Sequence, residues 1–407
     1  MSRLLTYYGD DFTGSTDVME ALASHGVRTA LFTRLPDAAQ WAAFQDYDVI
    51  GLAGTSRSQT PDWMDLHLPG VFQWLKTLEG RFCHYKVCST FDSSPKVGSI
   101  GRAIDIGLRV FNQSRATLLI GAPQLKRYTF AGHLFAGYQG RIYRIDRHPV
   151  MSVHPVTPMD ESDVLRHLAK QTAAAVDVLD VDDLATQKAA GEALLNLSVE
   201  SLPLIIGSSG VEYAMMAAMG KTRNASFASV APVAQMPVIS GSVSPTTERQ
   251  IKYASCHGFT PLAADAVALA RGQADGLLAK ARALMAAGHS PLVYSASGPG
   301  SDQGETLKTI PNGRETLSRT LGQIARHLIS EFRLKRLVIA GGDTSSHALG
   351  ELDIHALTTR YPLNETPGSP LCVAHSSNPD FDGLEVAMKG GQVGGDDYFV
   401  KLKNGLP

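Results

Sequence analysis

Short apolar runs alternate with amphipathic stretches along the 407 residues of the chain. Residues 47–54 (YDVIGLAG), 116–122 (ATLLIGA) and 202–210 (LPLIIGSSG) are apolar on both faces, whereas residues 98–111 (GSIGRAIDIGLRVF) have the period of a helix. Strands that are buried on both faces and alternate with helices are typical of a parallel sheet covered on both sides. The pattern therefore predicts an α/β fold.

The alternation breaks once, at residues 221–235 (KTRNASFASVAPVAQ), which are small or polar and have no clean period. We interpret this stretch as a linker. After it, a second α/β unit begins, and one of its helices carries an apolar stripe made of Leu317, Leu321, Ile324, Leu328, Ile329 and Phe332. We predict two domains (1–220 and 236–407), each with a mostly parallel doubly wound sheet, and an active-site cleft between them.

Composition excludes several classes of protein. Hydrophobic residues make up 44% and charged residues 19% of the chain, and the net charge is −2. No global basic field would attract nucleic acid or an anionic membrane. The four cysteines form no C-x-x-C pair, and the start of the chain lacks the apolar core of a signal peptide. We expect a cytoplasmic protein without membrane spans, disulfides, nucleic-acid partners or membrane partners.

The first candidate site is the motif GDDFTG, which follows an apolar strand and precedes a helix. A helix N-terminus stabilises a carboxylate through its N–H groups, so capping explains one of the two aspartates, Asp10 and Asp11. The alternative is that they bind substrate hydroxyls, or that one of them acts as a general base.

A second polar cluster occupies residues 86–101 (KVCSTFDSSPKVGSIG). Lys86 ends a strand-like run and is followed by Ser89, Thr90 and Asp92. Hydroxyls beside a lysine and a glycine-containing helix start suit an anion site. A polar loop with capping serines fits the same residues, and the sequence does not decide between the two.

Three junctions in the second half contain glycine: 240–247 (SGSVSPTT), 340–346 (AGGDTSS) and 389–395 (KGGQVGG). Ser244–Pro245 has the form of an N-cap with proline at the first helical position. We expect Thr344, Ser345 and Ser346 to cap another helix. Together the three junctions would offer several backbone donors to a polyphosphate, although ordinary turns remain an alternative.

Several common motifs are absent from the sequence. There is no G-x-x-x-x-G-K-[ST], no G-x-G-x-x-G and no H-E-x-x-H, so no P-loop, dinucleotide fingerprint or zinc protease site is indicated. His133, His148 and His154 fall near loops, where we interpret them as structural. The metal ligands stay unassigned.

Eight motifs, taken in order, resemble the four-carbon acid sugar kinase family over essentially the whole chain. They are GDDFTG, TSRS (55–58), KVCSTFDSS, GAPQ (121–124), GSSGVEYA, SGSVSPTT, GGDTSS and MKGGQVGG. The resemblance implies an N-terminal sugar-acid-binding domain and a C-terminal nucleotide-binding domain. It also implies transfer of phosphate from ATP to a hydroxyl of a small acid such as threonate, erythronate, a 3-oxo-tetronate or a branched sugar acid.

Site residues are implied by the same resemblance. The acid sugar would contact Asp10, Asp11, Arg57, Lys86, Ser89, Thr90 and Asp92. ATP would contact Ser240, Ser242, Gly341, Gly342, Asp343, Thr344, and Gly390 or Gly391, where KGGQVGG departs from the KSGNFG that is usual in the family. Arg57 suits the substrate carboxylate, Lys86 suits that acid or the transferring phosphoryl group, and Mg²⁺ would bridge the ATP phosphates. The catalytic base stays open among Asp10, Asp11, Asp92 and Asp343.

Two rival functions remain at this stage. A non-catalytic sensor of acid sugars and nucleotides would need a degraded nucleotide lobe, and no glycine motif there is disrupted by bulky residues. A dehydrogenase of acid sugars is less favoured, because the dinucleotide fingerprint is missing. A homodimer is left open.

Overall fold

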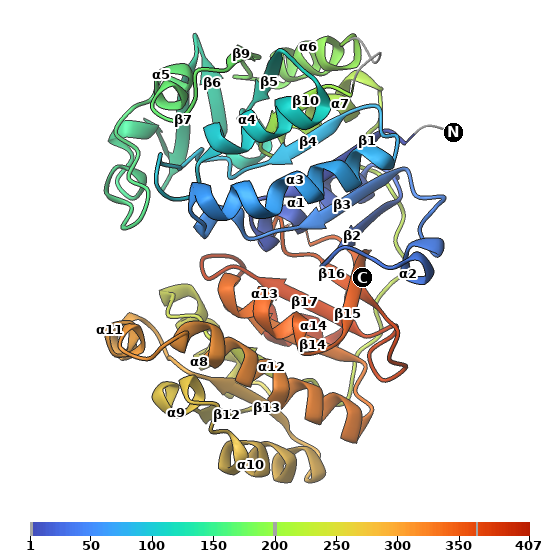
Figure 1. Ribbon diagram of the computed structural model, residues 1–407. Helices are drawn as coiled ribbons and strands as arrows, with labels where there is room; N and C mark the ends of the chain where they lie inside the picture. The colour runs from blue at the N-terminus through green and yellow to red at the C-terminus, as the bar shows by residue number, and fades with distance from the viewer. Residues whose placement is uncertain (1–2, 198–201, 364) are drawn as a thin grey trace. The chain divides into compact units, whose positions relative to one another are not determined.

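The computed structural model describes residues 3–197, 202–363 and 365–407, apart from the side chain of Asp343. The chain divides into two compact units, Met1–Ala225 and Ser226–Pro407. Each unit is an α/β layer structure, coloured blue to green and yellow to red in Figure 1. The predicted α/β class is confirmed.

The first unit is built on parallel strands that were expected from the apolar runs. Every neighbouring pair in this part of the sheet is parallel. The strand order is β2 (Thr29–Phe32), β3 (Val49–Ala53), β1 (Leu5–Gly9), β4 (Cys83–Lys86), β10 (Leu204–Gly207), β5 (Arg115–Leu119) and β9 (Ala175–Val178).

Helices cover both faces of this sheet, as a doubly wound fold requires. On one face α3 (Pro61–Thr77) packs against α4 (Ile100–Phe111). On the other, α7 (Gly210–Ala218) packs against α1 (Phe12–Ser24) and α6 (Leu184–Leu195). The short α2 (Ala38–Ala42) lies between β2 and β3.

Strand order reverses direction between β1 and β4. From β1 the chain builds β2 and β3 on one side and then crosses to β4 on the other side. Ligands of such sheets bind beyond the carboxyl ends of the strands at the switch point. Gly9 is in register with Lys86, so the residues that follow both strands leave the sheet at the same edge.

A small antiparallel sheet in the first unit was not predicted. It consists of β6 (Arg127–Phe130), β7 (His133–Tyr138) and β8 (Arg141–Arg144). Its two turns are Ala131–Gly132 and Gln139–Gly140, and both residues of each turn have positive φ. The usual sequence signal of such turns is Asn-Gly or Asp-Gly, and neither pair occurs in this sheet. The short helices η3 (Ile145–Arg147), η4 (Met151–Val153) and α5 (Val164–Ala169) follow.

The second unit repeats the switch-point arrangement. Its order is β12 (Phe259–Ala263), β13 (Ser290–Tyr294), β11 (Val238–Ser240), β14 (Arg336–Ala340), β17 (Glu385–Lys389), β16 (Leu371–Ser376) and β15 (Ile354–Tyr361). The pairs from β12 to β17 are parallel, whereas β15, β16 and β17 pair antiparallel. The switch lies between β11 and β14, so the prediction of a mostly parallel sheet in each unit is confirmed.

Helices of the second unit follow the predicted pattern. In α12 (Gly313–Phe332) the predicted stripe is buried apart from Phe332, which is half-buried. Ser244 accepts a hydrogen bond from the N–H of Thr246 and caps α8, which begins at Pro245 as predicted. The remaining helices are α9 (Ala266–Ala270), α10 (Asp275–Ala286), α11 (Gly304–Lys308), α13 (Gly342–Gly350) and α14 (Tyr398–Asn404).

The passage from one unit to the other falls inside the predicted linker. Val230, in its second half, is buried and pairs with Leu406. Arg336 donates to the carbonyl of Ala231, and Arg360 donates to the carbonyl of Ala228. This half of the segment is therefore held by the second unit. The functional boundaries 1–220 and 236–407 stay a prediction, as does the cleft.

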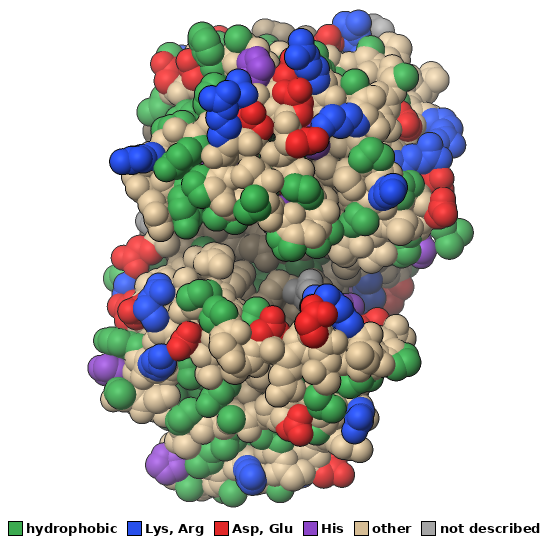
Figure 2. Space-filling view, turned by 90° about the vertical axis from the view of Figure 1, so that its left-hand side faces the viewer, with side chains coloured by type: hydrophobic (Ala, Val, Ile, Leu, Met, Phe, Trp, Pro, Cys, Tyr) green, Lys and Arg blue, Asp and Glu red, His purple; other side chains and the backbone are tan. Residues whose placement is uncertain are grey.

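Charge is evenly spread on the face shown in Figure 2, where basic and acidic side chains are interspersed on each unit. This agrees with the small net charge. No helix in the described part of the chain is long and apolar enough to cross a bilayer.

We expect Arg336→Ala to destabilise the second unit strongly. The Arg336 side chain is 2% exposed and donates to Glu385 at 2.8 Å and to the carbonyls of Leu402 and Ala231. Removing one partner of a buried pair costs about 3–5 kcal/mol. In a urea titration the control Arg319→Ala, at an exposed pair with Glu315, should cost at most about 1 kcal/mol. Equal losses in the two variants would contradict this account.

Candidate active site

The two adjacent aspartates have different environments. Asp11 is the N-cap of α1 and accepts a hydrogen bond from the N–H of Gly14 at 2.5 Å. The prediction that capping accounts for one aspartate is confirmed. Asp10 is 4% exposed, and its Oδ1 has no hydrogen-bond partner among the described residues. Burial, and then the charge of Asp11, raise the pKa of Asp10 to about 7.

Arg57 joins two carboxylates. It lies in η1 (Ser56–Ser58), just beyond β3. Its Nη1 donates to Asp11 at 2.9 Å, and its Nη2 donates to both oxygens of Asp92 at 2.9 and 3.1 Å. Its backbone N–H donates to the carbonyl of Asp10. The structure thus brings Arg57 together with the three aspartates that sequence analysis named as site candidates.

Asp92 is held as a carboxylate. Besides Arg57, it accepts hydrogen bonds from the hydroxyls of Thr90 at 2.5 Å and Thr157 at 2.9 Å. Burial by itself would raise the pKa of Asp92, but the charge of Arg57 and the hydroxyl hydrogen bonds outweigh it and hold the pKa below its usual value. An aspartate whose lone pairs are occupied in this way is a poor base.

Thr157 was missed by sequence analysis. The Nδ1 of His154 accepts a hydrogen bond from the N–H of Thr157 at 3.1 Å, which orders the residue that reaches Asp92. His154, which sequence analysis interpreted as structural, therefore orders the threonine that donates a hydrogen bond to Asp92. Because Thr157 is 65 positions from Asp92, no local pattern announces this contact.

Lys86 ends β4 and is 2% exposed. Its Nζ lies 3.9 Å from the carboxylate of Asp17. Burial by itself lowers the pKa of Lys86, but the charges of Asp17, Asp11 and Asp10 outweigh it, so the pKa lies above its usual value. Lys86 is therefore a permanent cation beside the aspartates. Ser89 lies half-buried in the turn after β4.

The first unit thus separates its carboxylates by environment. Asp92 stays ionised, whereas Asp10 takes up or releases a proton near neutral pH. Carboxyl groups whose pKa values are pushed apart in this way are the usual sign of an acid/base assignment. Chemically, the site can accept a proton at Asp10 beside a fixed cation, Lys86.

The three glycine-bearing junctions of the second unit converge. A Cβ on Gly241, after β11, would lie 2.1 Å from Thr344 Oγ1, after β14. A Cβ on Gly391, after β17, would lie 3.1 Å from Ser242 Oγ. Glycine is favoured at both positions, because a Cβ at Gly241 would collide with the Thr344 hydroxyl and a Cβ at Gly391 would be crowded by Ser242 and Ser244. Ser240 is the buried last residue of β11.

A buried lysine lies at this convergence and was missed. Lys389, the last residue of β17, is 1% exposed and donates to Thr247 Oγ1 at 2.9 Å, and Thr247 Oγ1 lies 2.9 Å from Ser242 Oγ. Burial lowers the pKa of Lys389 to about 7. None of the described carboxylates lies within ion-pair distance of it. The signal in the sequence was the lysine directly before the glycine pair.

One expectation about this region is wrong. Thr344, Ser345 and Ser346 lie inside α13, whose N-cap is Gly341 with φ 119°, so they do not cap it. A Cβ on Gly342 would meet no atom within 4 Å, so its backbone faces open space. Gly390 follows β17, and its carbonyl accepts from the N–H of Val393 at 3.5 Å. The side chain of Asp343 lies outside the described residues.

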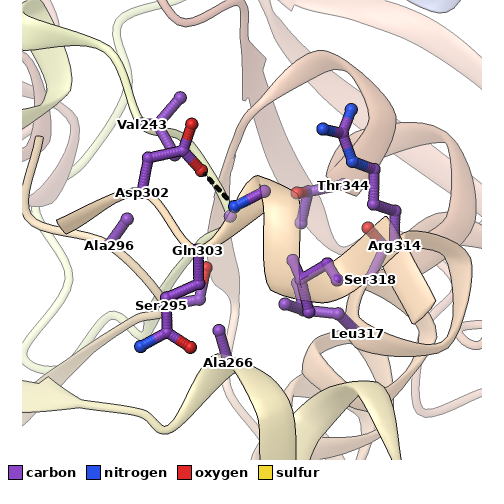
Figure 3. Close-up of a pocket in the computed structure, with 13 residues that line it drawn as sticks. Val243, Ala266, Ser295, Ala296, Asp302, Gln303, Arg314, Leu317, Ser318 and Thr344 are labelled. Atoms are coloured by element: carbon purple, nitrogen blue, oxygen red, sulfur yellow. Dashed lines mark hydrogen bonds between the residues drawn. The ribbon is translucent and has the colours of Figure 1, made fainter. Parts of the chain in front are cut away.

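A pocket of about 180 Å³ opens beside these junctions, beyond the carboxyl ends of β11, β13 and β14 (Figure 3). Its wall combines apolar side chains with polar ones, including Ser295, Gln303 and Arg314, which sequence analysis did not single out. Asp302 shapes the wall by accepting a hydrogen bond from the N–H of Gly304 at 2.8 Å. A mixed pocket beside converging backbone turns is suited to a nucleotide.

Comparisons with known proteins agree with this division. Residues 5–244 match a family described as a sugar-binding N-terminal domain, and residues 238–399 match a nucleotide-binding C-terminal domain. The 3-oxo-isoapionate kinase of Paraburkholderia graminis is 38% identical and covers 99% of this chain and 94% of its own length. A 3-oxo-tetronate kinase of Pseudomonas fluorescens is 30% identical over 98% of this chain and 96% of its own.

Solved structures show the same fold. A Haemophilus influenzae protein superposes with a TM-score of 0.71 at 22% identity, covering 97% of this chain and 98% of its own. A Salmonella typhimurium protein does so with a TM-score of 0.77 at 21% identity, covering 98% of both chains. Because sequence similarity spans nearly the full length and both domain models match, the chain belongs to the four-carbon acid sugar kinase family.

Proposed function

We propose that this protein is an ATP-dependent kinase that phosphorylates a hydroxyl of a small 3-oxo acid sugar. Relatives named for 3-oxo-isoapionate and 3-oxo-tetronate support the substrate class. Identity is 38% to the first kind and 30% or less to the second, which favours a 3-oxo-isoapionate-like acid. The first unit binds the acid sugar and the second binds ATP. A cytoplasmic location belongs to the same proposal and is supported by four free cysteine thiols.

The observation that carries the proposal is the state of Asp10. It is a buried carboxyl group with a pKa of about 7, at the switch point of a sheet in a kinase family, and one of its oxygens has no partner among the described residues. A general base is most effective when its pKa lies near the working pH. Asp10 accepts the proton of the substrate hydroxyl, the hydroxyl oxygen bonds to the γ-phosphorus, and ADP leaves with the electron pair of the broken P–O bond.

The other site residues of the first unit position the substrate and neutralise negative charge. Lys86 is a fixed cation beside Asp10, where it can hold the acid sugar or the transferring phosphoryl group. Arg57 holds Asp11 and Asp92 in place, and their oxygens face the same edge as Asp10. In this proposal Asp11, Ser89 and Thr90 contact substrate hydroxyls.

Nucleotide binding falls to the junctions of the second unit. We place the ATP phosphates against Ser240, Ser242, Thr344 and the glycines at 341, 342, 390 and 391. The buried amine of Lys389 is linked through Thr247 to Ser242 in this region, and no described carboxylate lies within ion-pair distance of it. A polyphosphate would supply the missing negative charge. No cluster of three metal-ligating side chains occurs among the described residues. In this proposal Mg²⁺ would arrive on the ATP phosphates, where it would neutralise charge, as is usual for this ion.

A kinase screen tests the function. Purified protein is incubated with Mg²⁺-ATP and each of a set of C4 and branched C5 acid sugars, with and without a 3-oxo group, and ADP and sugar phosphate are measured together. We expect phosphorylation of a 3-oxo acid sugar. ATP hydrolysis without sugar phosphate, or binding without turnover, would contradict the kinase function and favour a sensor.

Asp10→Asn should lower kcat by about 10²–10⁴-fold, the range for loss of a general base. The wild-type kcat/KM for the acid sugar should rise with pH through an apparent pKa near 7, since only ionised Asp10 accepts a proton. Ser89→Ala is a matched control at the same edge and should lose much less. If kcat/KM of the Asp10→Asn variant still rises with pH near pH 7, Asp10 is not the base.

The same substitution should stabilise the protein at alkaline pH. The folded pKa of about 7 exceeds the usual value of 3.8, so the contribution of Asp10 to stability falls between these two pH values and is lowest above pH 7. Asn cannot ionise, so the variant does not lose stability as the pH rises through this range. We expect a higher Tm for Asp10→Asn than for wild type at pH 8, by about 2–4 °C for each kcal/mol recovered. The difference should vanish below pH 4, and a lower Tm at pH 8 would contradict the assignment.

ATP binding should take up a proton at pH 8 through Lys389. Free Lys389 is mostly neutral there, because its pKa is about 7, and phosphate would stabilise its charged form. Calorimetry in two buffers of different ionisation enthalpy measures this uptake. Lys389→Met should abolish it and weaken ATP binding about ten- to hundredfold, whereas the exposed Lys252→Met should change neither. Uptake that persists in Lys389→Met would contradict the role of Lys389.

A further inference from the structure

Arg127 is a cation at the edge of the first sheet where the carboxyl ends of the parallel strands lie. It belongs to none of the eight motifs and has no role in the function proposed above. It begins β6 and pairs through its backbone with Ala122, just after the carboxyl end of β5. The two residues exchange hydrogen bonds of 2.9 and 3.1 Å. Since β5 is parallel to β10, and β10 to β4, this end lies on the same edge of the sheet as Lys86.

The guanidinium of Arg127 is anchored by one nitrogen only. Its Nη1 donates to the carbonyls of Leu125 at 3.0 Å and Lys126 at 3.2 Å. Its Nε is buried without a protein acceptor among the described residues, and its Nη2 makes no hydrogen bond to them. The Nε–Nη2 side of an arginine offers two parallel N–H donors, which match the two oxygens of a carboxylate.

None of the described carboxylates compensates the charge of Arg127. Its side chain is partly buried, and no described Asp or Glu lies within ion-pair distance. Burial lowers the pKa of Arg127, with only small opposing effects of Cys88 and Tyr128. A buried, unpaired charge is costly unless a ligand supplies its partner. Arg57 is the opposite case, since both of its terminal nitrogens already donate to carboxylates.

The two arginines follow strands of the same parallel sheet. Arg57 lies just beyond β3, and Arg127 pairs with Ala122 just beyond β5, so both lie at the edge where the carboxyl ends of these strands emerge. A substrate carboxylate at Arg57 would approach Asp11 and Asp92 and be repelled by them. At Arg127 it would meet no described carboxylate.

We propose that Arg127 binds the carboxylate of the acid sugar through Nε and Nη2, and that Arg57 positions Asp11 and Asp92 instead. The proposal deepens the function proposed above and rests on it. It replaces the expectation, drawn from the family resemblance, that Arg57 reads the substrate carboxylate. Selection of acids over neutral sugars then resides at Arg127.

The test measures discrimination between an acid and a neutral substrate. The probes are 3-oxo-isoapionate and an analogue in which a hydroxymethyl group replaces the carboxylate. The proteins are wild type, Arg127→Met, Arg127→Lys and the control Arg141→Met, an exposed arginine of the same small sheet. Calorimetry gives the affinity for each probe, kinetics give kcat/KM, and ATP binding with a melting curve reports the fold.

We expect Arg127→Met to lose about ten- to hundredfold in affinity and kcat/KM for the acid and little for the neutral analogue. Arg127→Lys should lose less, because it keeps the charge but not the fork, and Arg141→Met should behave as wild type. KM for ATP should not move. Equal losses for both probes, or a folded Arg127→Met with wild-type discrimination, would overturn the assignment. A wild-type protein that phosphorylates no acid sugar would overturn the proposed function first.

Discussion

The parallel pairing of β1 with β4 is the constraint on which the site depends. Gly9 lies in register with Lys86, and the N–H of Asp10 donates to the carbonyl of Lys86 at 2.9 Å. A buried carboxylate and a buried cation therefore leave adjacent strands at one edge, where the strand order reverses. The second unit repeats this arrangement with β11 and β14, whose following residues meet at Gly241 and Thr344. In both units the candidate site residues lie beyond the carboxyl ends of the strands at which the strand order reverses.

Electrostatics then assign different roles to similar residues. Asp92 has a guanidinium and two hydroxyls as partners and stays ionised, whereas Asp10 has an unpartnered oxygen and holds a proton up to about pH 7. Arg57 pairs directly with Asp11 and Asp92, whereas burial is the main cause that raises the pKa of Asp10, and the charge of Asp11 adds to it. In the proposed mechanism, burial without a full set of partners turns an ordinary aspartate into a base at neutral pH, at a cost in stability.

Local patterns predicted what depends on local physics. The apolar runs predicted the strands, one of the two aspartates of GDDFTG and Ser244 were recognisable as helix caps, and the stripe of α12 followed from its period. Residues joined only by tertiary structure were not predictable: Thr157 reaches Asp92 across 65 positions, and Lys389 reaches Thr247 across 142. The sheet that carries Arg127 was hidden, because Ala131 and Gln139 occupy turn positions where Asn or Asp would have given a signal. Family resemblance supplied the activity, which no spacing alone could have given.

The two buried lysines show how charge balance distinguishes the two units. Lys86 lies among carboxylates, so its pKa is raised and its charge is compensated within the protein. Lys389 is equally buried, but it donates a hydrogen bond to the hydroxyl of Thr247, and burial lowers its pKa to about 7. A site whose charges are already balanced suits a ligand that is mostly hydroxyl, with one anionic group to be recognised separately. A site with an uncompensated lysine among close-packed glycines suits a ligand that brings several negative charges, because that ligand restores the balance which the protein leaves open.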